Sequence, residues 1–358
     1  MRYDTNPNRK ILVTKIIAGL VILGLLAGGL ALVMHLVDRN SDGEEGRFGD
    51  TGDWGKKPAE EEASEGGSDE EEYGDENVLI FGDKEYIYTD DIRSYLFIGT
   101  DSTGKSAGDD HGEMADFLML MIINRTQNSY GFIPLNRDTI MDVPMLDDKG
   151  EYIGTYPEQL CIAHWYGRNS EERNENTVFA VSNLLGGLEI DGYYAINMDD
   201  IGAFNNAIGG VMVTIDGDLT AVDPEFTDGA EVLLSDEQAE KFLRARMSVG
   251  EGTNQERMSR QLQYMQAAYG RLINQLRENP AYINDLYAEV QDKVETDRSA
   301  KQLSEFAKYI GKSESLGFLQ ITGEVKEGDT LKDGVQHAEF YPDEKSLIGA
   351  LAQVITFY

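Results

Sequence analysis

Cysteine is nearly absent from this 358-residue chain, and basic residues are scarce. The single cysteine, Cys161, excludes an internal disulfide, so a folded domain must be stabilised by its core alone, with Cys161 expected as a buried apolar residue. The chain has 31 Lys and Arg against 65 Asp and Glu, a net charge of −34. Such a surface repels phosphate backbones and argues against nucleic-acid binding.

Two common kinds of metal or redox motif are also missing. The sequence contains neither a CxxC pair nor an HExxH motif, and neither His111 nor His164 has a partner at metal-ligand spacing. Redox-thiol and zinc-hydrolase mechanisms therefore have no support.

One long uncharged run is present, at residues 16–34. At about 1.5 Å per residue it spans about 28 Å, close to the hydrocarbon thickness of a bilayer. Basic residues precede it and strongly acidic sequence follows it, so the positive-inside rule predicts a cytoplasmic N-terminus. We predict a cytoplasmic tail at 1–10 and a single transmembrane anchor at 11–37, with the rest of the chain extracellular.

Two further features of this segment bear on its role. A cleaved signal peptide would have a shorter apolar core and a small-residue cleavage site, so we favour an uncleaved anchor. Gly24 and Gly28 have GxxxG spacing, which allows two membrane helices to approach closely and is compatible with a weak homodimer.

Residues 38–77 hold 16 acidic and 4 basic residues and few apolar ones. Because like charges repel and little apolar surface is available for a core, we expect an extended, disordered linker. The remaining residues, 78–358, are long enough for one large extracytoplasmic domain.

Apolar runs and helical periodicities alternate along this domain. The pattern predicts an α/β fold in which a mixed central β-sheet is covered by helices on both faces. Segments 78–82 and 85–89 should form a small hairpin, and Ser235 has capping-box spacing at a helix start. The other expected strands are 95–101, 117–124, 129–138, 193–200, 211–216 and 315–325, and the expected helices are 175–187, 200–210, 235–246, 255–278 and 282–311.

Acidic residues lie at the ends of several predicted strands. Asp101 follows one strand, Asp116 leads into the next, and the pair Arg137 and Asp138 follows a third. Neighbouring carboxylates at strand ends could hold Mg²⁺, which prefers oxygen ligands and often shares substrate phosphates. The alternative is that each Asp only caps a turn.

Arginine is concentrated in one region of this acidic chain. Arg244 and Arg246 end a predicted helix, a Gly-rich loop follows, and the next helix carries a row of polar residues at i, i+3, i+4 and i+7. Guanidinium groups and helix N-termini both bind phosphate, so this region suits an anionic ligand. The alternative is a solvated helix face balanced by Glu251 and Glu256. The row consists of Arg257, Arg260, Gln261 and Tyr264.

Several motifs together resemble the LytR-CpsA-Psr family of cell-envelope glycopolymer phosphotransferases. The R-x-R motif at 244 followed by R-x-x-R-Q at 257 is the most specific of them. The others are YLFIGTDS at 95–102, MADFLMLMIIN at 114–124, IPLNRDTIMDVP at 133–144 and the long stretch 177–215.

The resemblance implies a fold and a reaction. The fold is a mixed sheet between helices with an apolar pocket for a polyprenyl chain. The reaction moves a glycopolymer, such as a teichoic acid or capsule chain, from undecaprenyl pyrophosphate to a peptidoglycan sugar hydroxyl, with Mg²⁺ on the pyrophosphate. A non-catalytic regulator that binds polyprenyl phosphates or a polymer is the alternative.

The resemblance also implies roles for individual residues. Asp101 and Asp116 match the metal-associated carboxylates, and Arg137 and Asp138 match the RD pair. Either Asp116 or Asp138 would take the proton of the acceptor hydroxyl. The pyrophosphate-binding set corresponds to Arg244, Arg246, Arg257 and Gln261.

Two positions depart from the family pattern. Met114 stands where the family usually has an arginine two residues before the metal-associated aspartate, and Asn254 stands at a usually acidic position. Arg93 or another cation could replace the missing charge.

Overall fold

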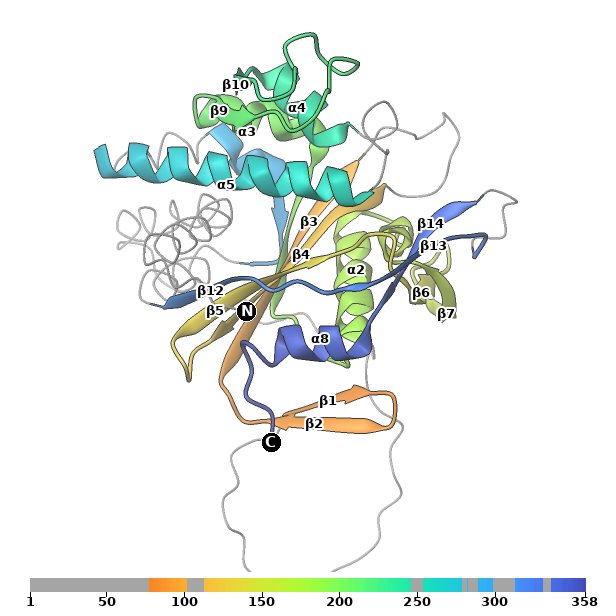
Figure 1. Cartoon of the computed structure of the whole chain (residues 1–358). Coiled ribbons are helices and arrows are strands. Elements are labelled where there is room, and N and C mark those ends of the chain that lie inside the picture. Colours follow the sequence, from red (N-terminus) through yellow and green to blue (C-terminus); the bar gives the residue numbers. More distant parts are fainter. Residues whose placement is uncertain are drawn as a thin grey trace, which may run out of the picture.

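The computed structural model describes residues 77–101, 113–245, 254–278, 282, 289–298, 313–330 and 336–358. At its centre lies a six-stranded mixed sheet with the strand order β11-β8-β3-β4-β5-β12 (Figure 1). β3, β4 and β5 run antiparallel to one another, whereas β8 pairs parallel with β3 and β12 pairs parallel with β5. The strands are β3 (Ile92–Asp101), β4 (Met114–Asn124), β5 (Ser129–Leu135), β8 (Gly192–Asn197), β11 (Val294–Thr296) and β12 (Glu314–Phe318).

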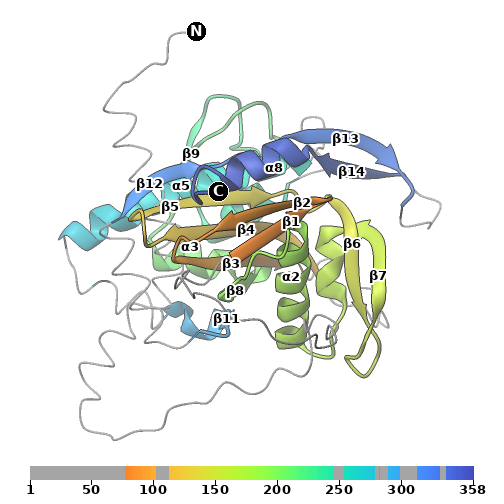
Figure 2. The same cartoon turned by 90° about the horizontal axis from the view of Figure 1, so that it is seen from below.

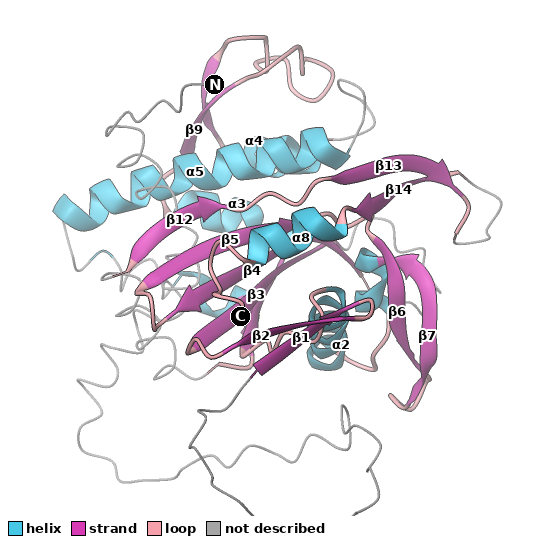
Figure 3. Cartoon of the chain, turned by 60° about the horizontal axis from the view of Figure 1, so that its bottom comes forward, coloured by secondary structure: helices cyan, strands magenta, loops and turns pink. Residues whose placement is uncertain are grey.

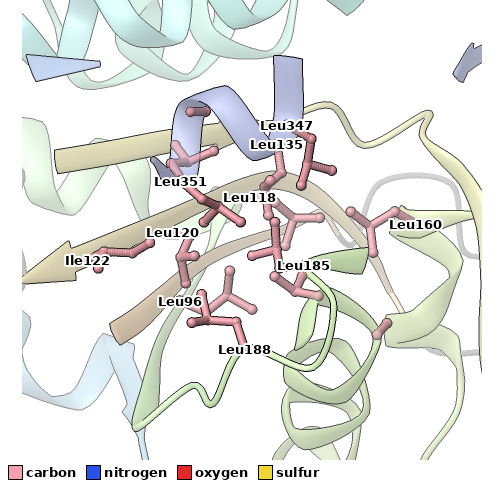
Figure 4. Close-up of a cluster of buried hydrophobic side chains, with 14 of the residues drawn as sticks. Leu96, Leu118, Leu120, Ile122, Leu135, Leu160, Leu185, Leu188, Leu347 and Leu351 are labelled. Atoms are coloured by element: carbon pink, nitrogen blue, oxygen red, sulfur yellow. The ribbon is translucent and has the colours of Figure 1, made fainter. Parts of the chain in front are cut away.

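The central strands are apolar along most of their length because both faces of the sheet are covered. One face carries leucine and isoleucine side chains that pack under α2 (Ser170–Leu184) and α8 (Glu344–Leu351), as Figure 4 shows. The other face carries aromatic and methionine side chains that pack against Met265 of α5 (Asn254–Glu278). The predicted mixed sheet with helices on both faces is therefore confirmed. Cys161 is fully buried, as expected.

The helix ends follow local sequence signals. The Asn169 side chain accepts a hydrogen bond from the Glu172 N–H at the start of α2, and Gly186 and Gly187 follow its end with φ of +71° and +87°. A Cβ on Gly186 would lie 2.8 Å from the Ile80 carbonyl oxygen, so only glycine fits there. Ser235 forms a full capping box with Gln238 at the start of α4 (Asp236–Arg244).

A second hydrophobic cluster lies at the top of Figure 1, beyond one end of the sheet. It is built from α3 (Ile201–Ala207), β9 (Val211–Thr214), β10 (Glu231–Leu234), α4 and α5. Phe226 and Phe242 meet edge to face at its centre, with ring centroids 5.8 Å apart. This cluster fixes α4 and α5 relative to each other. These two helices carry Arg244 and Arg257.

Three two-stranded hairpins surround the sheet (Figures 2 and 3). The hairpin predicted at the start of the domain is β1 (Asn77–Phe81) with β2 (Lys84–Tyr88). A second pairs β6 (Ile140–Leu146) with β7 (Tyr152–Gln159), and a third pairs β13 (Gly323–Gly328) with β14 (His337–Pro342). A parallel bridge from Thr139 to Phe340 joins the second and third hairpins beside the RD pair.

Two predictions for the C-terminal part are wrong. Residues 282–311 were expected to be helical, yet β11 at Val294–Thr296 pairs antiparallel with β8, because the open edge of β8 offers hydrogen bonds that the helical pattern does not reveal. The single strand expected at 315–325 is two strands, β12 and β13. The Leu319 N–H still donates to the Phe132 carbonyl at 2.7 Å, after which the chain leaves the sheet.

The predicted cytoplasmic tail, anchor and all but the last residue of the linker lie outside the described residues. Within the part of the chain that the structure describes, no helix is long and apolar enough to cross a membrane.

Candidate functional site

Asp116 occupies a β-bulge in the pairing of β3 with β4. Gly99 pairs with Phe117 and Thr100 with Ala115, which leaves Asp116 as the extra residue. A Cβ on Gly99 would approach the Phe117 Cβ to 2.9 Å, so the close strand approach beside the bulge requires glycine. Bulges commonly redirect one side chain near a functional site. Here the redirected side chain is a carboxylate that is only 7% exposed.

Two arginines from distant parts of the chain bind this carboxylate. Arg137 Nη1 donates to Asp116 Oδ1, and Arg257 Nη1 donates to Asp116 Oδ2 at 2.9 Å. Arg137 comes from the turn between β5 and β6, and Arg257 from the first turn of α5. Both guanidinium groups are buried. Buried charges persist only when paired, so the three side chains form one electrostatic unit.

The second member of the RD pair extends this unit. Arg137 Nε donates to Asp138 Oδ1 at 3.1 Å, so two buried arginines face two buried aspartates and their formal charges balance. Burial works to lower the pKa of the Arg137 guanidinium, but its neighbours, among them the hydrogen-bonded carboxylate of Asp138, outweigh burial and raise that pKa, so the group stays charged.

The loop that carries the RD pair is held rigidly. The Asn136 side chain accepts a hydrogen bond from the Asp138 N–H at 2.9 Å, an Asx-turn. Gln159, at the end of β7, donates to Asp138 Oδ1 at 3.4 Å and to the Ala338 carbonyl at 2.7 Å. The Phe340 N–H donates to the Asp138 carbonyl at 2.8 Å. The two hairpins therefore fix Asp138 from both sides.

Asp101 and Arg244 form a second pair at the same end of the sheet. Arg244 Nη2 lies 3.4 Å from Asp101 Oδ1, and the same nitrogen contacts Asp199, while Nη1 lies 3.1 Å from Glu240 Oε1. The pairing of Glu240 with Arg244 could have been expected from their i, i+4 spacing in a helix. Asp199 carries no such signal, because it lies 45 residues from Arg244.

The polar row on α5 is not a solvated helix face. Arg257, Gln261 and Tyr264 are buried, and Arg260 donates to the carbonyls of Phe242 and Ala245 at the end of α4. The alternative interpretation of this row is therefore wrong.

Within that row the side chains divide by partner. Arg257 reaches Asp116, whereas Arg260 binds the end of α4 and the Tyr264 hydroxyl lies 3.3 Å from Asn205 Oδ1. Both amide atoms of Gln261 are buried without a hydrogen-bond partner among the described residues. A buried, unsatisfied amide one turn after Arg257 is the kind of group that a bound ligand or water would satisfy. Arg246 and the Gly-rich loop up to residue 253 lie outside the described residues.

The LytR_cpsA_psr family model matches residues 56–348. The chain belongs to the LytR_cpsA_psr family.

Similar proteins agree with this assignment. A polyisoprenyl-teichoic acid–peptidoglycan teichoic acid transferase, TagU from Bacillus mycoides (strain KBAB4), is 27% identical over 253 residues, which cover 70% of this chain and 74% of TagU. The solved structure of gbs0355 from Streptococcus agalactiae superposes with a TM-score of 0.57 at 21% identity, covering 74% of this chain and 86% of that one. A structure of TagT bound to LI-WTA superposes with a TM-score of 0.52 at 18% identity, covering 74% of this chain and 89% of that one. These structural likenesses establish the fold.

Met114 occupies the position where the LytR_cpsA_psr resemblance leads us to expect arginine. Its sulfur lies 3.4 Å from Arg137 Nη2, directly beside the charged unit. Arg93 cannot replace the missing cation, so that suggestion is wrong. Arg93 pairs with Ile123 near the far end of β3, eight residues or about 26 Å from Asp101. There it forms salt bridges with Asp91 and Asp191.

The carboxylates of this site can be tested for their fit to a metal ion. Among the described residues, no group of three or more His, Cys, Asp and Glu side chains could hold a metal. Asp101 pairs with Met114 across the two strands, two residues from Asp116, so two carboxylates share this corner of the sheet. Mg²⁺ commonly uses one or two carboxylates together with substrate phosphates and water. The donor set therefore fits a Mg²⁺ that arrives with a phosphorylated substrate.

A nucleotide-binding sequence pattern begins at the end of β3. Residues 99–106, GTDSTGKS, fit the G-x-x-x-x-G-K-S spacing of a P-loop. A P-loop connects a strand to a helix in a parallel βαβ unit. Here the strand before the pattern, β3, pairs antiparallel with the next strand, β4, so the fold is not that of a P-loop NTPase. Residues 102–112 lie outside the described residues.

Proposed function

We propose that this protein is a phosphotransferase. It moves a glycopolymer, such as a teichoic acid or a capsule chain, from undecaprenyl pyrophosphate to a sugar hydroxyl of peptidoglycan. The observation that carries the proposal is the buried unit in which Arg137 and Arg257 share the carboxylate of Asp116. Family membership, the named activity of TagU and the LI-WTA bound to TagT support the same class of substrate.

The buried unit suits a pyrophosphate because phosphoryl transfer depends on positioning and on neutralising charge. Guanidinium forks match phosphate oxygens in geometry, and Arg137, Arg244 and Arg257 all lie at one end of the sheet. In the absence of substrate, the aspartates hold these arginines in place. When pyrophosphate binds, its oxygens accept hydrogen bonds from the same guanidinium groups, and Arg246 joins them in our proposal.

The proposed reaction is a single displacement at phosphorus. The acceptor hydroxyl oxygen attacks the phosphorus that carries the polymer, the P–O bond of the pyrophosphate bridge breaks, and polyprenyl phosphate leaves. Asp116 or Asp138 takes the hydroxyl proton, and a phosphodiester joins polymer and peptidoglycan. Asp101 and Asp116 would hold Mg²⁺, which would reduce the negative charge on the pyrophosphate when bound.

The proposed lipid site is the second face of the sheet. Phe117 follows Asp116 directly, and it packs on a cluster of buried aromatic and methionine side chains. Thioethers are flexible and fill irregular spaces, so Met119, Met121 and Met265 suit a face that opens for a polyprenyl chain. The leucine and isoleucine face on the other side of the sheet has stiffer side chains and forms the permanent core.

The proposed location is the cell membrane, with the 11–37 helix as a single-pass anchor and the folded domain outside. A donor with a polyprenyl tail stays in the membrane, so an anchored enzyme meets it there. The acidic linker would let the domain reach the wall. Pairing through Gly24 and Gly28 stays a prediction.

Reconstitution of the full-length protein tests the proposal. The purified protein is incubated with a lipid-pyrophosphate glycan, Mg²⁺ and peptidoglycan oligomers, and released polyprenyl phosphate and linked glycan are measured. Release together with linkage supports the transferase. Tight binding of donor without release supports the alternative, a polyprenyl-phosphate- or polymer-binding regulator.

The Arg244→Ala and Arg246→Ala variants refine this test. We expect each to abolish transfer while circular dichroism and melting temperature stay close to those of the wild type, and Arg244 belongs to none of the hydrophobic clusters of the described residues. Lys326→Ala, on the exposed β13 hairpin, is the matched control. Full activity of both arginine variants would overturn their assignment to the pyrophosphate.

A further inference from the structure

Asp199 lies at the edge of the proposed pyrophosphate site, although no sequence motif singles it out. It belongs to the short 3-10 helix η2 (Met198–Asp200), which follows β8 directly. Its carboxylate contacts Arg244 Nη2, the nitrogen that also faces Asp101 at 3.4 Å. Asp199 is half-exposed, whereas Arg244 and Asp101 are mostly buried. The pair therefore reaches from the surface into the site.

The backbone of Asp199 is fixed by its neighbours. The Asp199 N–H donates to Asn197 Oδ1 at 2.8 Å, and Asn197 Nδ2 donates to Glu113 Oε2 at 2.9 Å. Glu113 directly precedes β4, which carries Asp116. The ends of β4 and β8 are thus linked by one hydrogen-bonded path that continues through Asp199 to Arg244.

Arg244 is the last residue of α4, and its guanidinium group lies within salt-bridge distance of the carboxylates of Asp101, Asp199 and Glu240. Glu240, one turn earlier on the same helix, binds Nη1 at 3.1 Å and holds the guanidinium back along α4. Asp199 binds Nη2 from the side of the sheet and keeps that nitrogen beside Asp101. An arginine side chain that is oriented before substrate binds loses less rotamer entropy on binding.

We propose that Asp199 is a positioning residue that orients Arg244 toward the pyrophosphate. The inference rests on the proposed function for the identity of the ligand. If a Mg²⁺ that arrives with the substrate engaged Asp101, Asp199 would be the carboxylate that still holds Nη2 on the sheet side of the site. An exposed ion pair usually contributes little to stability. Loss of the Asp199 carboxylate should therefore change donor binding and turnover and leave the free energy of unfolding nearly unchanged.

The neighbouring residue provides a matched control. Asp200 is in the same 3-10 helix and forms an ion pair of its own, with Lys293 Nζ at 2.8 Å. Asp199→Asn and Asp200→Asn each remove one negative charge and one ion pair, but only the first changes the surroundings of Arg244. Asp199→Glu keeps the charge and tests rescue.

Steady-state transfer by the full-length protein is the first measurement. We expect Asp199→Asn to lower kcat/KM for the lipid-linked donor about tenfold, with the KM of the peptidoglycan acceptor unchanged. Asp200→Asn should stay within about twofold of wild type, and Asp199→Glu should recover most of the loss. Equal effects of the two asparagine variants, or a loss in Asp199→Asn that parallels a lower melting temperature, would overturn the proposal.

Calorimetric binding of farnesyl pyrophosphate separates this inference from the proposed function. We expect about tenfold weaker binding to Asp199→Asn and unchanged binding to Asp200→Asn. If wild-type protein binds farnesyl pyrophosphate in this pattern but never transfers glycan, the transferase proposal fails and the role of Asp199 stands. If wild-type protein transfers glycan and both variants behave alike in both assays, only the role of Asp199 fails. Absence of both binding and transfer in the wild type would overturn both.

Discussion

Arg257 Nη1 lies 2.9 Å from Asp116 Oδ2, although 141 positions separate the two residues in the chain. The contact joins the first turn of α5 to the bulge at the start of β4. Arg137 occupies the other oxygen of the same carboxylate. One aspartate thus connects three elements that meet only in the folded protein, and the following predictions begin from it.

Replacing Asp116 by Asn should destabilise the protein strongly. The change leaves two buried guanidinium groups with one fewer opposing charge, and breaking a buried ion pair typically costs about 3–5 kcal/mol. Urea unfolding followed by circular dichroism measures the loss. Asp142→Asn, on the exposed side of β6, is the control and should change the free energy of unfolding by less than about 0.5 kcal/mol. Equal stability of the Asp116→Asn variant and the wild type would contradict the buried geometry.

Replacing Met114 by Arg should have opposite effects on stability and on ligand binding. A new guanidinium would lie beside Arg137, whose Nη2 is 3.4 Å from the Met114 sulfur, and the like charges repel. We expect the free protein to lose about 1–3 kcal/mol of unfolding free energy. Pyrophosphate lipids should bind more tightly, and their binding should weaken more steeply with added salt.

Met114→Leu is the control for this experiment, because it keeps the volume without the charge. It should leave both the melting temperature and the salt dependence close to those of the wild type. Weaker pyrophosphate binding by Met114→Arg would mean that position 114 does not face the ligand.

Replacing Asn124 by Ala should loosen the C-terminus. The fully buried Asn124 donates through Nδ2 to Asp90 Oδ2 at 2.7 Å and to the Val354 carbonyl at 2.8 Å. Asp90 in turn accepts a hydrogen bond from the Thr356 N–H at 2.8 Å. Leaving this buried carboxylate with fewer donors should cost about 2–3 kcal/mol.

Urea unfolding and amide hydrogen exchange measure this effect. Protection should fall first in residues 352–358. Gln353→Ala, an exposed change three residues before Thr356, should leave the exchange pattern intact. A uniform loss of protection over the whole domain would show that Asn124 acts on global stability only.

His164 should make stability depend on pH. The imidazole is buried between the Glu113 carbonyl, 2.8 Å from Nδ1, and Asn174 Oδ1, 3.1 Å from Nε2. Burial lowers the pKa of His164 below its ordinary value of about 6.5, and the hydrogen bonds to Glu113 and Asn174 only partly oppose it. The unfolded chain therefore binds the proton more readily than the folded protein does.

The sign of the effect follows from this difference. The contribution of the neutral imidazole is fully present above about pH 6.5 and is lost as the pH falls toward the folded pKa. Urea unfolding at pH 7.5 and pH 5 should show a smaller loss in His164→Gln than in the wild type. His337→Gln, on β14, should keep the dependence of the wild type. If the unfolding free energy of the wild type did not change between pH 7.5 and pH 5, the predicted contribution of His164 would be ruled out.

Local signals in the sequence were reliable where a structure depends on neighbouring residues. The hairpin before Asp90, the capping box at Ser235 and the adjacent strands β4 and β5 all follow from periodicity and turn residues. The strand β11 did not, because a three-residue strand exists only through its pairing with β8. The second half of the strand expected at 315–325 leaves the sheet for the same kind of reason, since β13 pairs with β14 and not with the central strands.

The candidate site also contains residues that the sequence identified and relationships that only the structure revealed. The motifs and the family resemblance identified Asp101, Asp116, Arg137, Asp138, Arg244, Arg246, Arg257 and Gln261. The structure places the charged residues that it describes in two ion-pair groups at one end of the sheet. The sequence did not reveal Asp199, whose partner lies 45 residues away, or the position of Arg93 at the wrong end of β3.

The sequence by itself determined the acidity of this protein, its dependence on a core without disulfides, its α/β order and the positions of its aspartate and arginine motifs. These properties depend on composition or on residues close together in the chain. Only the tertiary structure decided which arginine meets which aspartate. A bulge between two strands directs Asp116 inward, and the packing of α5 on the sheet brings Arg257 to it. Such contacts depend on strand register and helix packing, which local periodicity does not encode.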